Sequence, residues 1–169
     1  MNPRDAVAKS VIAFEGGDSN HPADRGGATR YGLTFTLFCE LWPGSTYAKF
    51  QALTRDDVID LLTEHFALAP GYWRLADPSL RWAVIDFAIH SGIRTATRAL
   101  QRAAGVKDDG IFGPQTEYAV NGLAPERLLK RVTGERLEHL GRLLTRDPKQ
   151  SAFALGWLRR VATVLTEAA

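Results

Sequence analysis

The sequence predicts a mainly α-helical fold that forms one compact unit. Apolar residues recur at helical spacing through most of the chain, and no segment alternates apolar and polar residues long enough to indicate an extended strand. Proline and glycine stand where such helices would begin and end. The chain has 169 residues, 45% of them hydrophobic, which is enough to bury a core.

The first helix is predicted to begin at Asn2 and Pro3, which are typical of an N-cap and a first helical position. We expect it to stop at Gly16-Gly17. The polar, glycine-rich stretch from 18 to 31 predicts a loop or a small irregular hairpin. An approximate capping box of Thr54 and Asp57 then indicates the start of another helix.

The second half of the chain contains several further helix signals. They predict five helices. The first begins at Asp77-Pro78, the second covers 95–104 and stops at Gly105, and the third runs from Pro114 to Gly122. The fourth begins at Pro125, and the fifth covers 153–165.

Charge and cysteine content exclude several classes of protein. The net charge of +2 is too small to indicate a nucleic-acid partner. No apolar run reaches the roughly 18 residues of a membrane helix, and none follows Met1 as in a secretion signal. We therefore expect a protein that is made in a cytoplasm and does not insert into a membrane, and we expect it to be a monomer. The single Cys39 cannot form an internal disulfide and is expected to be a small buried hydrophobe.

The stretch from 15 to 34 holds the best candidates for catalysis. Glu15 lies where the first helix should end, and the partial negative charge of a helix C-terminus together with packing beside Phe14 would raise the pKa of its carboxyl group. A raised pKa suits a general acid. Asp24 follows on the loop, and such a pair of carboxylates is typical of glycosidases. The alternative is a solvated helix end and a turn-forming aspartate.

The same stretch resembles the signature of the glycoside hydrolase family 108 muramidases of phage endolysins. The matching residues are Glu15-Gly16-Gly17, Asp24, Gly26-Gly27, Thr29 and Gly32-Leu33-Thr34. Asp18 stands where the family often has an aromatic residue, and Leu33 where it has isoleucine. The resemblance implies a lysozyme-like helical fold with a small active-site hairpin.

The resemblance also implies a lysozyme activity (EC 3.2.1.17) that hydrolyses the β-1,4 bond between N-acetylmuramic acid and N-acetylglucosamine in peptidoglycan. By similarity to phage lysozymes, Glu15 would protonate the glycosidic oxygen, Asp24 would support a water or the developing positive charge, and Thr29 would position that water. No metal or cofactor is implied.

The rest of the chain resembles the peptidoglycan-binding region of the same family. The similar segments are 86–92, with His90 where the family usually has asparagine, 100–116, and 156–161. We expect a catalytic segment over 1–92 and a binding segment over 93–169 packed on it. The candidate contacts to glycan strands are Gly27, Tyr31, Trp73, Asp86, His90 and Gln115. Core packing is the alternative for Trp73, and much of the 100–116 motif could serve the fold.

Other functions remain as alternatives or are excluded. One alternative is a lytic transglycosylase, which would cleave the same bond with the muramoyl 6-hydroxyl in place of water. Another is a non-catalytic module that only binds peptidoglycan. The four histidines, His21, His65, His90 and His139, lack cysteine partners and the His-Glu-x-x-His spacing of a zinc peptidase. The resemblance implies a protein of phage or prophage origin that is made in a bacterial cytoplasm. Because its substrate would be the cell wall, another component must release or export it to the wall or periplasm.

Overall fold

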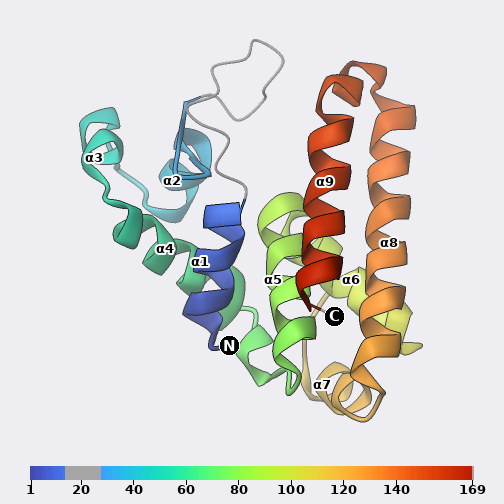
Figure 1. Cartoon of the computed structure of the whole chain (residues 1–169). Coiled ribbons are helices and arrows are strands. Elements are labelled where there is room, and N and C mark those ends of the chain that lie inside the picture. The colour runs from blue at the N-terminus through green and yellow to red at the C-terminus, as the bar shows by residue number, and fades with distance from the viewer. Residues whose placement is uncertain (14–27, 169) are drawn as a thin grey trace.

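The computed structural model describes residues 1–13 and 28–168, and within them the protein is a helical assembly with one small hairpin (Figure 1). The first half comprises α1 (Pro3–Ala13), β1 (Thr29–Arg30), β2 (Leu33–Thr34), α2 (Phe35–Leu41), α3 (Tyr47–Ala52), α4 (Arg55–Thr63), the π-helix η1 (Glu64–Leu68) and the 3-10 helix η2 (Tyr72–Arg74). The second half comprises α5 (Pro78–Ser91), α6 (Ile93–Ala104), α7 (Pro114–Asn121), α8 (Pro125–Arg146), the 3-10 helix η3 (Pro148–Gln150) and α9 (Ser151–Ala168). The predicted mainly helical, lysozyme-like class is confirmed.

Helix α1 begins as the sequence predicts. The Asn2 side chain accepts a hydrogen bond from the Asp5 amide at 2.8 Å, which satisfies one of the free N–H groups of the first turn. The predicted stop at Gly16-Gly17 lies outside the described residues.

The predicted irregular hairpin is a short antiparallel pair in which Thr29 lies opposite Thr34 and Arg30 opposite Leu33. Its two-residue turn has positive φ angles of 50° at Tyr31 and 81° at Gly32. Two successive positive φ angles are typical of the tight turns that match the twist of a hairpin. The hairpin lies later in the chain than expected, because its second strand extends to Thr34.

The two helices after the hairpin were not predicted from the sequence. Both α2 and α3 are short, and each begins at a threonine, Thr34 or Thr46, whose side chain accepts a hydrogen bond from the first turn. A cluster of aromatic rings holds them together, with Phe50 packed against both Phe35 and Phe38. Cys39 on α2 is half-buried, so the expectation of an enclosed thiol is wrong.

Helix α4 confirms the predicted capping box. The Thr54 hydroxyl accepts from the Asp57 amide, and the Asp57 carboxylate accepts from the Thr54 amide at 2.8 Å. The helix then widens into η1 and ends before Gly71, whose φ of 86° reverses the chain.

Helix α5 is the central element of the molecule. It packs against α1, α6, α8 and α9, and its side chains from Trp82 to Ala88 are all buried (Figure 1). The Trp82 indole donates a hydrogen bond to Ser10 on α1 at 3.0 Å. Because the middle of α5 is buried on all sides, it needs neighbours on all sides.

The helices of the second half begin and end near their predicted limits. Asp77 caps α5, and Gly105 ends α6 with a φ of 74°. Helices α8 and α9 form a long antiparallel hairpin beside α5 (Figure 1). The buried core is continuous across both halves and includes Val7, Ile85 and Val164. In the described part of the chain, no helix is long and apolar enough to span a membrane.

Candidate functional site

Three of the predicted site residues, Glu15, Asp24 and Gly27, lie outside the described residues. The described chain stops at Ala13 at the end of α1 and resumes at Ala28 before the hairpin. Figure 1 shows that α1 and α5 both run upward in this view, toward the side of the molecule that carries the hairpin, while α8 and α9 extend farther up.

The hairpin fixes two other predicted residues, Thr29 and Tyr31. Arg30 between them donates a hydrogen bond to the Leu53 carbonyl at 2.6 Å and lies 5.1 Å from the Tyr31 ring. Both Thr29 and Tyr31 are half-buried, and Tyr31 packs partly against the core. The hairpin is therefore tied to the first residue after α3, and it holds both side chains in defined positions.

A buried ion cluster forms where α5 meets α8 and α9. Asp86 is 0% exposed, and its carboxylate is bound by Arg160 at 2.6 Å and by Arg136 at 2.8 Å. Burial alone would raise the pKa of Asp86, but the two guanidinium groups hold it below its ordinary value. Asp86 is thus a charged group in the core, and its two partners come from the C-terminal hairpin.

His90 extends this cluster one turn farther along α5. Its Nδ1 lies 3.3 Å from Nη2 of Arg136, and its ring meets the edge of the Trp157 ring at a centroid distance of 5.8 Å. Burial and the nearby Arg136 and Arg160 lower the pKa of His90 to about 3. Since a guanidinium can only donate, Nδ1 of the neutral ring accepts and Nε2 carries the proton.

These positions bear on the glycan contacts predicted for Asp86 and His90. A carboxylate that is fully buried and bound by two arginines has no surface to offer a ligand, so its position indicates that Asp86 holds α8 and α9 against α5. His90 is half-buried and keeps the Nε2 proton, so a direct contact remains a prediction for it.

The predicted motif from 100 to 116 is organised around a buried glutamine. Nε2 of Gln101 lies 2.9 Å from Oδ1 of Asp109 and 3.0 Å from Oγ1 of Thr116, and Oε1 accepts from the Gly110 amide at 2.8 Å. Gly110 has a φ of 82°, which only glycine adopts easily. The motif residues Gln101, Asp109, Gly110 and Thr116 therefore build the loop. Gln115, the predicted contact, is exposed on α7.

Trp73 is on the surface. Its neighbour Tyr72 is buried and its hydroxyl donates to the Ile93 carbonyl at 3.0 Å, while Trp73 itself is 51% exposed. The alternative of core packing for Trp73 is therefore wrong.

The arginines of the buried cluster were not singled out from the sequence. Arg136 interrupts the apolar stripe of α8, standing four residues from both Val132 and Leu140, which are buried. A charged residue at a core position of a helix indicates a buried partner, so this pattern contained a usable signal. Arg160 lies in the 156–161 segment that resembles the family, but nothing in the local sequence indicates that it has a buried partner.

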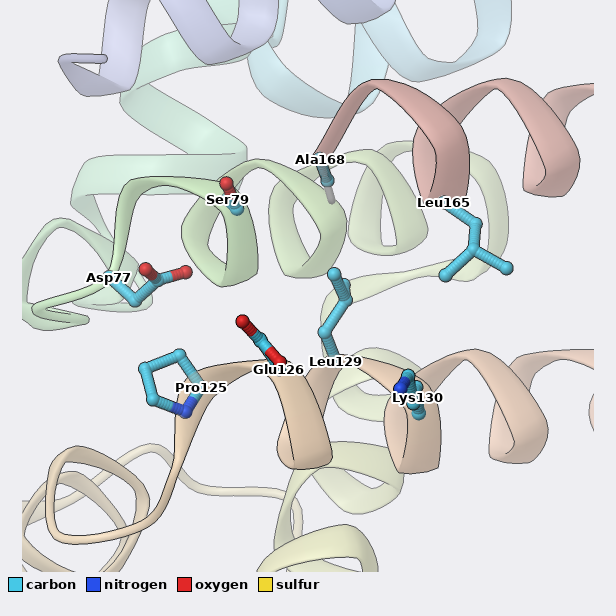
Figure 2. A pocket seen from close by; sticks show the side chains of 8 residues that line it. All are labelled: Asp77, Ser79, Pro125, Glu126, Leu129, Lys130, Leu165 and Ala168. Carbon is cyan, nitrogen blue, oxygen red and sulfur yellow. The ribbon is translucent and has the colours of Figure 1, made fainter.

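The described residues include no group of three or more His, Cys, Asp or Glu side chains that could hold a metal ion. They do include a hollow of about 440 Å³ where the start of α5 meets α8 and α9 (Figure 2). Its lining residues are Asp77, Ser79, Pro125, Glu126, Leu129, Lys130, Leu165 and Ala168. None of the predicted site residues is among them.

This chain is similar to two protein-family models and to solved structures. Residues 8–92 match the family model for glycosyl hydrolase 108, and residues 95–162 match that of a predicted peptidoglycan domain. A solved structure, that of Brucella abortus SagA, is 33% identical to this chain, with a TM-score of 0.81, and the match covers 98% of this chain and 94% of that one. A comparison with curated proteins finds no match.

The helical fold, the small hairpin and the two matched segments define a glycoside hydrolase that acts on peptidoglycan. The chain belongs to the glycosyl hydrolase 108 family, whose model covers half of it, and a peptidoglycan-binding domain follows the catalytic segment.

Proposed function

We propose that this protein is an N-acetylmuramidase that hydrolyses the β-1,4 bond between N-acetylmuramic acid and N-acetylglucosamine. The observation that carries the proposal is the family match over residues 8–92, because this segment contains the Glu15, Asp24 and Thr29 signature. The similarity to SagA over nearly the whole of both chains supports a shared architecture.

In this mechanism Glu15 donates a proton to the glycosidic oxygen as the bond to the muramic acid carbon breaks. The described part of α1 ends at Ala13, two residues before Glu15. Figure 1 shows that α1 and α5 both run toward the side of the molecule that carries the hairpin. A carboxyl group that follows the C-terminal end of a helix is disfavoured as an anion, which keeps it available as an acid.

Asp24 and Thr29 support the attack of water in the same proposal. Asp24 stabilises the positive charge that develops on the sugar ring or accepts a proton from the water, and the Thr29 hydroxyl orients that water. Thr29 is suited to this role because its strand is anchored through Arg30 to the Leu53 carbonyl. No metal or cofactor takes part.

Product analysis of digested peptidoglycan tests the reaction directly. Mass spectrometry should find reducing N-acetylmuramic acid ends as the main product of the purified protein. Anhydro-muramic ends as the main product would replace the hydrolase by a lytic transglycosylase. Undigested murein at several pH values, with protein still bound to it, would leave only a wall-binding role.

A further inference from the structure

Among the large hydrophobic side chains that the structure describes, the two most exposed, Tyr118 and Ile111, lie in α7 and just before it, and Trp73 lies on the adjoining turn. Tyr118 is 86% exposed, Ile111 is 70% exposed and Trp73 is 51% exposed. Exposed hydrophobic side chains that gather in one place mark binding sites, whereas single ones need no explanation.

Helix α7 carries a groove along one face. The hollow there has a volume of about 550 Å³. It is lined by Pro114, Glu117, Tyr118, Asn121 and Gly122. Positions 114, 117, 118 and 121 recur at the spacing of a single helix face, so Tyr118 lies over the groove together with polar groups. Gln115, the predicted contact, lies one turn before Tyr118.

The turn that carries Trp73 is bound to the same helix. Nε of Arg74 binds the Glu117 carboxylate at 2.7 Å, and its guanidinium lies 5.6 Å from the Trp73 ring. The Asn121 side chain accepts from the Ala76 amide at 3.0 Å and donates to the Arg74 carbonyl at 3.0 Å. Trp73 from the hydrolase segment and Tyr118 from the peptidoglycan domain are therefore presented by one rigid junction.

The support beneath this surface is also rigid. Gln101 fixes the loop from Asp109 to Thr116 through its buried side-chain hydrogen bonds, and Phe112 of this loop accepts a hydrogen bond from Arg74 at 3.1 Å. A surface that is ordered before the ligand arrives loses less entropy when it binds.

The chemistry of the groove favours an uncharged ligand with flat apolar faces. Arg74 neutralises Glu117, so little charge faces the groove, which is also lined by the Tyr118 ring and the Asn121 side chain. Sugar rings present apolar C–H faces to aromatic side chains and hydroxyl or acetamido groups to amides. We propose that this surface, formed by Trp73, Ile111, Tyr118 and the groove face of α7, binds the glycan strand of peptidoglycan. The inference rests on the proposed function for the identity of the strand.

This surface lies far from the end of α1 that precedes Glu15. Figure 1 shows α7 at the lower end of the molecule and the last turn of α1 toward the upper end. The protein therefore holds glycan at a place separate from the proposed hydrolysis, so binding and cleavage can be changed independently.

The test measures binding to intact murein and to chitin oligosaccharides, which are uncharged β-1,4 chains of N-acetylglucosamine without stem peptides. Tyr118→Ala and Trp73→Ala should each weaken binding about fivefold or more, as expected when a central aromatic contact is lost. Tyr118→Phe keeps the ring and should bind within about twofold of wild type. Leu155→Ala is a matched control, because Leu155 is 59% exposed on α9, away from α7. Thermal unfolding should show that all four variants are folded.

Hydrolysis of short soluble glycans should be unchanged in Tyr118→Ala, which separates this site from the chemistry. Unchanged binding by both alanine variants would overturn the proposal while leaving the proposed function intact. Dependence on Tyr118 that is seen with intact murein but not with the chitin oligosaccharides would also overturn it, because the ligand would then include the stem peptide. A wild-type protein that neither binds nor cleaves murein would instead refute the proposed function.

Discussion

At the scale of single residues, the described structure separates side chains that hold the fold from those that can meet a ligand. Asp86 and Gln101 belong to segments that resemble family motifs, yet both are buried and fully engaged with their own chain. Tyr118 and Trp73 are exposed, and their rings offer surface to a ligand. Resemblance to a family motif alone therefore does not identify a ligand contact.

Asp86→Asn should destabilise the protein strongly. The amide keeps the shape of the carboxylate but leaves Arg136 and Arg160 beside a neutral group, and breaking a buried ion pair typically costs about 3–5 kcal/mol. Urea denaturation measures this change. Asp56→Asn is the matched control, because Asp56 pairs with Arg4 at 2.9 Å on the exposed surface, and such pairs are worth about 1 kcal/mol or less. Similar small losses in both variants would show that the buried cluster adds little stability.

Asp24→Asn should slow murein hydrolysis at least about tenfold without unfolding the protein, because charge support in an active site is typically worth a few kcal/mol. Initial rates of turbidity loss measure the effect. A rate within about twofold of wild type at matched stability would assign Asp24 to a structural turn.

At the scale of elements, the central helix α5 depends on the C-terminal hairpin for its polar as well as its apolar contacts. Arg136 of α8 and Arg160 of α9 bind the Asp86 carboxylate, and Trp157 of α9 meets the His90 ring. A buried polar cluster that joins three helices makes their packing sensitive to any change in its charge.

Acid should weaken this junction through His90. The unfolded chain takes up a proton at His90 below about pH 6.5, whereas the folded protein does so only near pH 3, so stability falls as the pH drops between these values. The slope for one such group approaches about 1.4 kcal/mol per pH unit.

His90→Gln should reduce this loss, because glutamine can still accept from Arg136 and does not titrate. Urea midpoints from pH 7 to pH 4 compare the two proteins. His65→Gln is the control and should change this loss less, because Glu40 opposes the effect of burial on the pKa of His65, which lies on η1 and not in the Asp86 cluster. A pH dependence that is unchanged in His90→Gln would contradict the role given to His90.

The elements that the sequence predicted well are those with strong local signals. A proline at the start or a glycine at the end of a helix locates α5 to α8 to within a few residues. The Thr54 capping box does the same for the start of α4. Helices α2 and α3 have only threonine caps and are stabilised by aromatic contacts between each other, which a single-sequence pattern does not show. The partners of Asp86 lie 50 and 74 residues away along the chain, so only the fold identifies them.

At the scale of the whole molecule, the two family segments form one structure. Their core is continuous from Val7 to Val164, and Asp86 of the first segment pairs with Arg136 and Arg160 of the second. Trp73 and Tyr118 also come from different segments but are joined through Arg74 and Glu117. The peptidoglycan-binding domain thus helps to stabilise the fold of the hydrolase segment.

Unfolding should therefore be a single cooperative transition. Tryptophan fluorescence and far-UV circular dichroism should give the same midpoint in urea. A fragment of residues 1–92 should fail to fold, because the faces of α5 that meet α8 and α9 would be exposed together with Asp86. Two separate transitions, or a folded fragment, would contradict this unity.

In the proposed mechanism Glu15 is the general acid for glycan cleavage, and the activity of a Glu15→Gln variant measures that role. The amide keeps the size and polarity of the acid but cannot donate a proton to the leaving oxygen, a step worth about 10² to 10⁴ in rate. We predict that Glu15→Gln melts at or slightly above the wild-type temperature, still binds murein, and releases almost no soluble fragments. A folded Glu15→Gln protein that clears murein at nearly the wild-type rate would contradict the mechanism.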